Sequence, residues 1–517
     1  MSYHFITLAV ILFLATLSFI FAYTAFIPLM PIEQFKRWRN SWYAVTLIAF
    51  LSSNFWIFII LSGLYILYIA KREVDIFALY FVLLFAIPAF EQQIPGIGID
   101  HLFPMSYPRL LSFTLLLPIF LSNTSKLEKI TFGKTWPDKI ILAIMLLSFF
   151  LALRGTSFTN TLRIGITSFL DIFLPYYAAS RVVKDMNQLK KVMIAFVIGC
   201  LIAAVIAIFE FTKSWILYNN LGDALGVDWS MGGYMERGAN IRAISSLGHP
   251  LALGYIMMIA IGFYLFTAPT IKSKTIRLLG FGVLSAGLFV TLSRGPWLGG
   301  IALIILFLVT GPNILKRFII FVLVALLALP ALKIIPGGNK IIDILPFIGT
   351  SEQFNVDYRA KLLENSIKVI IKNPLFGVYD ARKEPEMQEL IQGEGIIDIV
   401  NTYLGVALSR GLVGLTLFVG FFLLVLRGTY KTMRNFPKRS EEHLCGRSLI
   451  SCLIAILVTI YTVSGIGIIP IVYWSIAGLM LSYSRINKSF PNSGSESESN
   501  RTSLSDKQVF PTTLVRK

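Results

Sequence analysis

Long runs of apolar residues, separated mostly by short polar connections, recur along nearly the whole chain. A membrane-spanning helix needs about 20 consecutive, mostly apolar residues, and by that measure the chain carries about 14 candidate spans. We therefore expect an all-α polytopic membrane protein with about 12 to 14 transmembrane helices. The candidate spans cover residues 5–29, 41–70, 75–91, 109–122, 138–153, 164–180, 192–212, 250–266, 278–293, 296–311, 318–334, 411–426, 447–465 and 466–486.

The second run, 41–70, is longer than one span requires and contains Ser52-Ser53-Asn54 near its middle. It has two interpretations: one long span, or a hairpin of two helices that changes the position of the N-terminus. The first run, 5–29, has neither a basic segment before it nor a small-residue cleavage site after it. We therefore expect it to be a retained span and not a cleaved signal peptide.

The polar segment 335–410 differs from the other connections because it is long and patterned to fold. Apolar residues at helical spacing predict an amphipathic helix over 357–372, which Asn373-Pro374 ends. A second short helix is predicted to begin at Pro385. We expect the segment to bring a carboxylate-bearing stretch to the mouth of the helical bundle. The predicted apolar face of the first helix consists of Leu363, Ile367, Ile370 and Ile371.

Composition supports the membrane interpretation, because 56% of the residues are hydrophobic and only 14% are charged. We expect one integral membrane domain over 1–486, with the loop 335–410 inserted, and a disordered polar tail over 487–517. The net charge of +18 invites a nucleic-acid interpretation. An excess of Lys and Arg is nevertheless typical of cytoplasmic loops, so we expect membrane lipid and no nucleic acid as a partner. The cysteines are not spaced as a disulfide framework or a metal site.

The Lys and Arg residues gather in connections that share one side of the membrane if the candidate spans alternate. That side is expected to be cytoplasmic, with 335–410 outside and the tail 487–517 inside. Lys36, Arg37 and Arg39 fall on the wrong side in this count. The basic connections are 71–72, 126–134, 181–191, 272–277, 316–317 and 427–439.

Several arginines fall on the outer side, close to the ends of spans. An arginine near hydrocarbon is costly and commonly marks a partner or a substrate path, and its guanidinium matches phosphate oxygens bidentately. The alternative is contact with lipid headgroups, which we favour for Arg109, Arg154 and Arg237. The local sequence favours diphosphate binding for Arg242, Arg294 and Arg359, with Arg163 as a further candidate.

Three ordered motifs across 240–430 carry a resemblance to a known family. They are Ser-Arg-Gly-Pro-Trp-Leu-Gly at 293–299, the Tyr358-Arg359 helix running to Asn-Pro-Leu-Phe-Gly-Val at 373–378, and Asn-Thr-Tyr-Leu at 401–404 followed by Gly-Leu-Val-Gly-Leu at 411–415. In order, spacing and position relative to the predicted spans, they resemble the O-antigen ligase and polymerase superfamily.

The resemblance implies a GT-C-like, metal-independent glycosyltransferase without a cofactor. Such enzymes take polyprenyl-diphosphate-linked oligosaccharides as donors at the outer face of the bacterial inner membrane, and other polysaccharide export proteins are implied partners. Ligases of the family carry a His directly before the Asn of the third motif, where this chain has Val400. The sequence therefore favours a polymerase of lipid-linked repeat units for a surface or exopolysaccharide. The alternatives are a ligase that moves glycan to a lipid or protein acceptor, and a transporter of lipid-linked sugars.

Transfer to a sugar hydroxyl needs stabilisation of the leaving diphosphate and a base for the hydroxyl proton. The outer arginines supply the first. For the second we nominate Asp398 together with Asn401, three residues on and on the same face if the stretch is helical, and also Glu394. The alternative for Asp398 is a helix-capping acid, and for Glu394 simple surface exposure. Further candidates are Tyr403 and His249, the latter with a capping role before Pro250 as its alternative.

Two acidic residues stand inside apolar sequence, Asp171 and Glu210. A carboxylate in hydrocarbon is costly unless it has a partner. We expect both to pair with arginines and to hold the bundle together.

Overall fold

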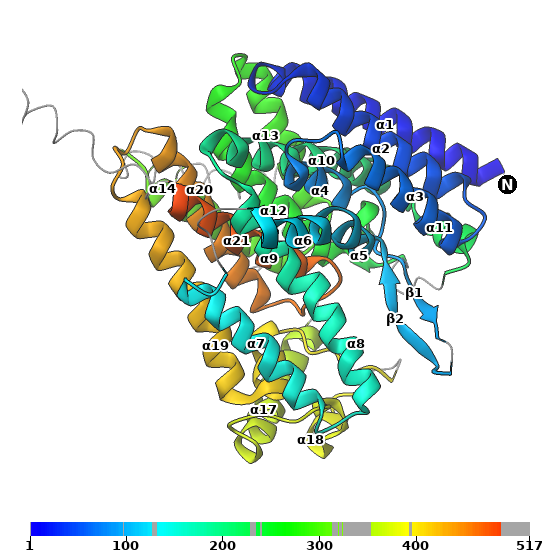
Figure 1. Cartoon of the computed structure of the whole chain (residues 1–517), viewed down its shortest axis with the longest axis vertical. Coiled ribbons are helices and arrows are strands. Elements are labelled where there is room, and N and C mark those ends of the chain that lie inside the picture. The colour runs from blue at the N-terminus through cyan, green and yellow to red at the C-terminus, as the bar shows by residue number, and fades with distance from the viewer. Residues whose placement is uncertain are drawn as a thin grey trace, which may run out of the picture.

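The computed structural model describes residues 2–96, 98–126, 132–227, 234–237, 240–312, 319, 323, 353–391 and 395–486. The candidate span 318–334, the first part of the long loop, Glu394 and the tail 487–517 thus lie wholly or largely outside the described residues. The regular structure of the described residues is almost entirely helical, which confirms the predicted all-α membrane architecture (Figure 1). Five described helices are long and apolar enough to cross a membrane, and three shorter apolar helices accompany them.

The helices follow one another with few interruptions by strands. In chain order they are α1 (Ser2–Phe26), α2 (Ile32–Leu51), α3 (Phe55–Ala70), α4 (Ile76–Leu84), α5 (Tyr107–Leu111), α6 (Leu117–Lys126), α7 (Trp136–Ala152), α8 (Phe158–Ser168), α9 (Leu174–Val182), α10 (Met186–Lys213), α11 (Asn219–Leu225), α12 (Pro250–Thr267), α13 (Lys274–Phe289), α14 (Arg294–Val309), α17 (Gln353–Lys372), α18 (Pro385–Gln388), α19 (Thr402–Met433), α20 (Glu441–Ile460) and α21 (Ile469–Ile486).

Two candidate spans contain π-helical turns, η2 (Ser112–Leu116) between α5 and α6 and η3 (Phe169–Phe173) between α8 and α9. Two short antiparallel ribbons complete the described structure, β1 (Glu91–Pro95) with β2 (His101–Ser106) and β3 (Glu236–Arg237) with β4 (Asn240–Ile241). In the first ribbon Glu91 lies opposite Ser106, and a bulge follows Gln93.

The run 41–70 is a hairpin. Its two helices, α2 and α3, are separated at Ser52, and the Asn54 side chain caps α3 by accepting a hydrogen bond from the Ile57 N–H at 3.0 Å. His4 Nε2 lies 2.8 Å from the Phe50 carbonyl oxygen, so α1 begins beside the end of α2. The N-terminal end of α1 therefore lies at the same end of the bundle as the α2–α3 turn.

The basic residues that did not fit the alternating count join the other basic connections in the structure. Arg37 pairs with Glu73 at 3.1 Å, and Lys191 pairs with Asp75 at 3.0 Å. Lys190 pairs with Glu441 at the start of α20. The start of α2, the α3–α4 turn, the start of α10 and the start of α20 thus share one end of the bundle. In Figure 1 the N-terminal end of α1 lies on the right, away from α14 and α20 on the left.

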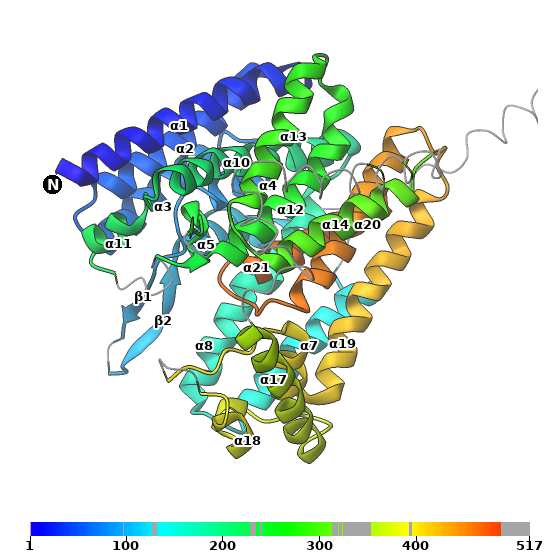
Figure 2. The ribbon, with the colours of Figure 1, turned by 180° about the vertical axis from the view of Figure 1, so that it is seen from behind.

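The opposite end of the bundle carries the ribbon β1–β2 and the helices of the long loop. Figures 1 and 2 both show α17 and α18 beside the ends of α7, α8 and α19. Both helices are where the sequence predicted them, although α17 begins earlier than predicted, at Gln353. The predicted apolar face of α17 is wrong, since Leu363, Ile367 and Ile371 are exposed. The buried face is instead formed by Tyr358, Leu362 and Val369, which pack on α18 and α19 residues.

The helix α19 is two segments joined at Gly411, where φ is +66°. The rings of Tyr403 and Phe418 lie 6.1 Å apart. In a straight helix these residues would be separated by about 22 Å along the axis. The first segment, 402–410, therefore folds back alongside the second and forms a helical hairpin at the end of the bundle that carries the long loop.

Candidate active site

The turn at Gly411 is held by the segment 373–378. The N–H groups of Leu412 and Val413 bond the carbonyls of Pro374 and Leu375 at 2.7 and 3.2 Å, and the Val378 N–H bonds the Leu408 carbonyl at 2.8 Å. A Cβ added at Gly411 would come within 2.2 Å of the Leu375 oxygen. Only glycine combines this backbone conformation with so close an approach. The second and third motifs of the sequence are therefore one structural unit.

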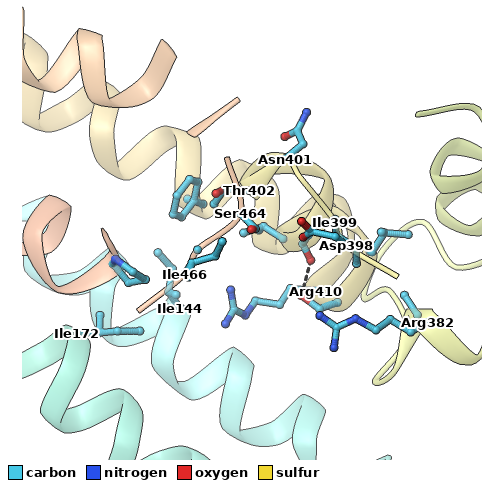
Figure 3. A pocket seen from close by; sticks show the side chains of 18 of the residues that line it. Ile144, Ile172, Arg382, Asp398, Ile399, Asn401, Thr402, Arg410, Ser464 and Ile466 are labelled. Carbon is cyan, nitrogen blue, oxygen red and sulfur yellow. Dashed lines mark hydrogen bonds between the residues drawn. The ribbon is translucent and has the colours of Figure 1, made fainter. Parts of the chain in front are cut away.

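A cavity of about 550 Å³ lies under this unit, between the α19 hairpin, α21 and the turn that joins α20 to α21. Its size falls in the range of small-molecule sites, about 300–1,000 Å³. Ile144, Phe418 and Trp474 supply apolar wall. The polar lining includes Tyr473. It also includes Asp398, Arg382, Arg410, Asn401 and Ser464, which Figure 3 labels.

Asp398 is positioned through its backbone by Tyr358. The Tyr358 hydroxyl donates to the Asp398 carbonyl at 2.9 Å and accepts from the Asp398 N–H at 3.1 Å. Burial raises the pKa of the half-buried Asp398 carboxyl, and the nearby Arg382 and Arg359 cations and the Ser464 hydroxyl offset this only in part. A carboxylate with a raised pKa at the wall of a cavity is suited to proton transfer.

Asn401 lines the same cavity, but not for the reason that the sequence suggested. The stretch from Gly395 to Asn401 is not helical, so the shared-face argument is wrong. Asn401 is instead the N-cap of α19, and its side chain accepts hydrogen bonds from the N–H groups of Tyr403 and Leu404 at 2.9 and 3.2 Å. The capping role considered for Asp398 therefore belongs to Asn401.

The turn between α20 and α21 connects Asp398 with the predicted diphosphate-binding arginines. Arg359 donates to the Thr462 carbonyl at 3.2 Å. Gly295 packs against the other side of Thr462, since an added Cβ would lie 2.3 Å from its hydroxyl oxygen. Arg294 begins α14 directly before that glycine. Arg294 and Arg359 thus flank one short turn, whose Ser464 lies beside Asp398.

Arg242 joins Arg294 at the same place. Its guanidinium donates to the Ser293 hydroxyl at 2.9 Å and to the Thr291 carbonyl at 3.2 Å. Ser293 directly precedes Arg294, so two of the three predicted arginines meet at the α13–α14 turn. None of the three is part of the described lining of the cavity.

His249 has the capping role that the sequence left as its alternative. It is the N-cap of α12, and its Nδ1 accepts a hydrogen bond from the Leu251 N–H at 3.1 Å. Burial, with a smaller contribution from the nearby Arg242 cation, lowers the pKa of His249 to about 4. The imidazole is therefore neutral at neutral pH.

Other candidate residues have supporting contacts outside the cavity. Arg163 donates to the carbonyls of His101 and Leu102 and so braces the ribbon β1–β2. The Tyr403 hydroxyl donates to the Leu457 carbonyl at 2.9 Å and links α19 to α20.

The arginines assigned to lipid headgroups have protein partners in the structure. Arg109 pairs with Asp171 at 2.9 Å, which confirms the arginine partner predicted for Asp171. Arg154 donates to the carbonyls of Phe376 and Gly377, and Arg237 to that of Leu292. The three arginines thus have protein partners that the headgroup assignment did not include.

The arginine partner predicted for Glu210 is also wrong. Its carboxylate accepts backbone N–H bonds from Leu217, Ile244 and Ser245, and this satisfies it without a cation. A buried carboxylate needs hydrogen bonds, and these need not come from a charged side chain.

Sequence analysis missed Arg382, Arg410 and Ser464. Arg410 directly precedes the motif glycine at 411, and Gly414, four residues on, leaves room for its side chain. Arg382 had no comparable signal, because it lies between the two predicted helices of the loop. Ser464 lies in a turn that hydropathy assigned to the end of a span.

The fold and the site thus define a polytopic helical membrane protein that has a cavity lined by carboxylates and arginines at one end of its bundle. Residues 279–419 match the family model described as O-antigen ligase, which confirms the resemblance to the O-antigen ligase and polymerase superfamily. The match supports an O-antigen ligase- or polymerase-type function in polysaccharide assembly, with a lipid-linked glycan as partner. A search of curated proteins gave no match to this chain.

Proposed function

We propose that this protein is a metal-independent glycosyltransferase that polymerises lipid-linked oligosaccharide repeat units. It moves the growing glycan from a polyprenyl-diphosphate donor to a sugar hydroxyl of the next unit, at the outer face of the bacterial inner membrane. The observation that carries the proposal is Asp398, a half-buried carboxylate in the wall of a 550 Å³ cavity, clamped by Tyr358 and adjacent to two arginines.

In this proposal Asp398 takes the proton of the acceptor hydroxyl as the new glycosidic bond forms. Its raised pKa makes the carboxylate a stronger base than an exposed aspartate. The diphosphate leaves with the electron pair of the broken bond. Arg242, Arg294 and Arg359, all at the α13–α14 turn or beside Thr462, stabilise its charge.

The polymerase interpretation rests on position 400. Val400 stands where ligases of the family carry a His, and the nearby Asp398 supplies a carboxylate in the cavity instead. A ligase remains the second candidate, because the matching family model is described as O-antigen ligase. A lipid-linked sugar transporter is the third, and it would use the same cavity without bond cleavage.

A deletion strain examined for its surface glycan separates the three. We expect single repeat units in place of long chains, because units are still made and transferred when polymerisation stops. Long chains that remain on the lipid carrier would establish a ligase and contradict the proposal. Loss of lipid-linked product at the outer face would establish a transporter.

A further inference from the structure

Arg410 is a cation at the cavity wall, and the described residues supply no anionic partner for it. Its half-buried side chain lines the 550 Å³ cavity and also a second cavity of about 120 Å³ beside α7 and α8. Across the described residues, no carboxylate forms an ion pair with Arg410 and no acceptor hydrogen-bonds its guanidinium. A charge partly withdrawn from water is stabilised by an anionic partner, so an arginine at such a place indicates an anion that is supplied from outside.

The backbone around Arg410 directs its side chain to this position. Arg410 directly precedes the helical-hairpin turn at Gly411. A Cβ added at Gly414 would lie 2.3 Å from the Arg410 Cβ and 3.4 Å from its Cδ. Gly414 therefore provides the space through which the arginine stem passes. Figure 3 shows the guanidinium pointing into the cavity toward Ile144 and Ile466.

The cavity lining carries two carboxylates, Asp380 and Asp398, and two cations, Arg382 and Arg410. Asp398 is close to Arg382 and Arg359, whose charges act on its pKa, whereas Arg410 does not contribute to that shift. Arg410 is partly withdrawn from water, and the cavity wall combines apolar side chains, such as Ile144 and Phe418, with polar ones, such as Tyr473. A charge-assisted hydrogen bond is stronger in such surroundings than in water.

We propose that Arg410 is the cation of an anion-binding subsite in this cavity, which takes a phosphate or carboxylate group of the lipid-linked glycan. The inference rests on the proposed function, since it assigns the glycan substrate to the cavity. The anion has two possible sources, the diphosphate of the carrier or the carboxylate of an acidic sugar. A guanidinium fork binds either group with two parallel hydrogen bonds.

The test is a binding measurement on the purified full-length protein in detergent, with four probes. These are inorganic pyrophosphate, farnesyl diphosphate, a disaccharide that contains glucuronic acid, and its neutral counterpart. We expect the wild-type protein to bind at least one anionic probe, and Arg410→Gln to bind it about 10- to 100-fold more weakly. Arg410→Lys keeps the charge and loses the fork, so its affinity should lie between the two.

Arg427→Gln is the matched control, since it removes an exposed arginine from the other end of α19 and should leave binding unchanged. Binding of the two diphosphates alone identifies the carrier as the source, and binding of the acidic disaccharide identifies an acidic sugar. Equal anion binding by wild type and Arg410→Gln, or no anion binding by the wild type, overturns the proposal.

Thermal unfolding without ligand separates binding from packing. Removal of a half-buried charge that has no ion-pair partner among the described residues is neutral or stabilising, so the Arg410→Gln protein should melt at or above the wild-type temperature. A clearly lower melting temperature together with unchanged anion binding assigns Arg410 to packing and overturns the subsite. Because binding needs no glycan transfer, a deletion strain with normal chains would contradict the proposed polymerase while leaving the subsite intact.

Discussion

The clamp between Tyr358 and Asp398 gives the most specific test of how the loop serves the cavity. Tyr358→Phe removes the two hydrogen bonds of 2.9 and 3.1 Å that hold the Asp398 backbone. The Asp398 carbonyl keeps a bond from the Val400 N–H at 3.0 Å, whereas the Asp398 N–H loses the partner that the structure gives it. Two such bonds contribute about 1 to 3 kcal/mol.

If that free energy positions Asp398 for the reaction, its loss lowers the rate of glycan transfer about 5- to 150-fold. The assay is polymer formation by purified protein from lipid-linked repeat units, read as chain length on a gel. Tyr218→Phe is the control. It removes the hydrogen bond of 3.3 Å from the Tyr218 hydroxyl to the Ala86 carbonyl, and neither residue is part of the described cavity lining. We expect its rate to stay within about twofold of the wild type.

A double-mutant cycle with Asp398→Asn distinguishes positioning from general stability. In the Asp398→Asn background, Tyr358→Phe should cost no further rate, because the base that it positions is already absent. The free energy of unfolding should fall by a similar amount in both backgrounds, because the backbone bonds are the same. Equal losses of rate in the two backgrounds would show that Tyr358 does not act through Asp398.

Gly411→Ala should lower stability by more than about 2 kcal/mol, since φ is +66° and the added Cβ meets the Leu375 oxygen at 2.2 Å. The control is Gly420→Ala in the same helix, whose added Cβ meets nothing within 4 Å and which should be neutral or stabilising. Equal effects of the two substitutions on thermal unfolding would contradict the hairpin turn. Burial lowers the pKa of His249 from 6.5 to about 4, so the unfolded chain binds a proton that the folded protein does not, and stability is lost as pH falls from 6.5 toward 4. The wild type should lose about 2 kcal/mol between pH 7 and pH 5 relative to His249→Asn, and equal pH profiles would contradict a buried, neutral imidazole. In intact cells, a membrane-impermeant thiol reagent should label Glu364→Cys but not Lys431→Cys. The background should be low because the native cysteines are buried. The reverse labelling pattern would contradict the proposed outer position of the cavity.

The helices of this protein could be predicted from sequence because each apolar run is a local property of the chain. For 41–70 the sequence left two alternatives open, one long span or a hairpin, because Ser52-Ser53-Asn54 is compatible with a kink or a break. The contacts that decide between them, such as Arg37 with Glu73, join residues far apart in sequence. The buried face of α17 was predicted wrongly for a related reason. Both faces carry apolar residues, and only the neighbouring helices determine which is buried.

The candidate site was predictable where a motif marked it. Asp398 and Arg359 lie in or beside motifs, and the structure brings their charges together at Ser464. Arg410 was missed because it directly precedes the apolar run of a span, and only the turn at Gly411 directs it into the cavity. The partners of Arg163 were not predictable, because the carbonyls of His101 and Leu102 belong to a ribbon that the apolar pattern did not predict.

The measurement that tests the central claim most directly is the rate of polymer formation by purified Asp398→Asn. Asn keeps the size of the side chain and cannot accept the proton, so binding and packing should be little changed. A general base typically contributes about 10²- to 10⁴-fold, and we expect a loss of that order at an unchanged amount of folded protein. A rate within about threefold of the wild type would contradict the assignment of Asp398 as the base.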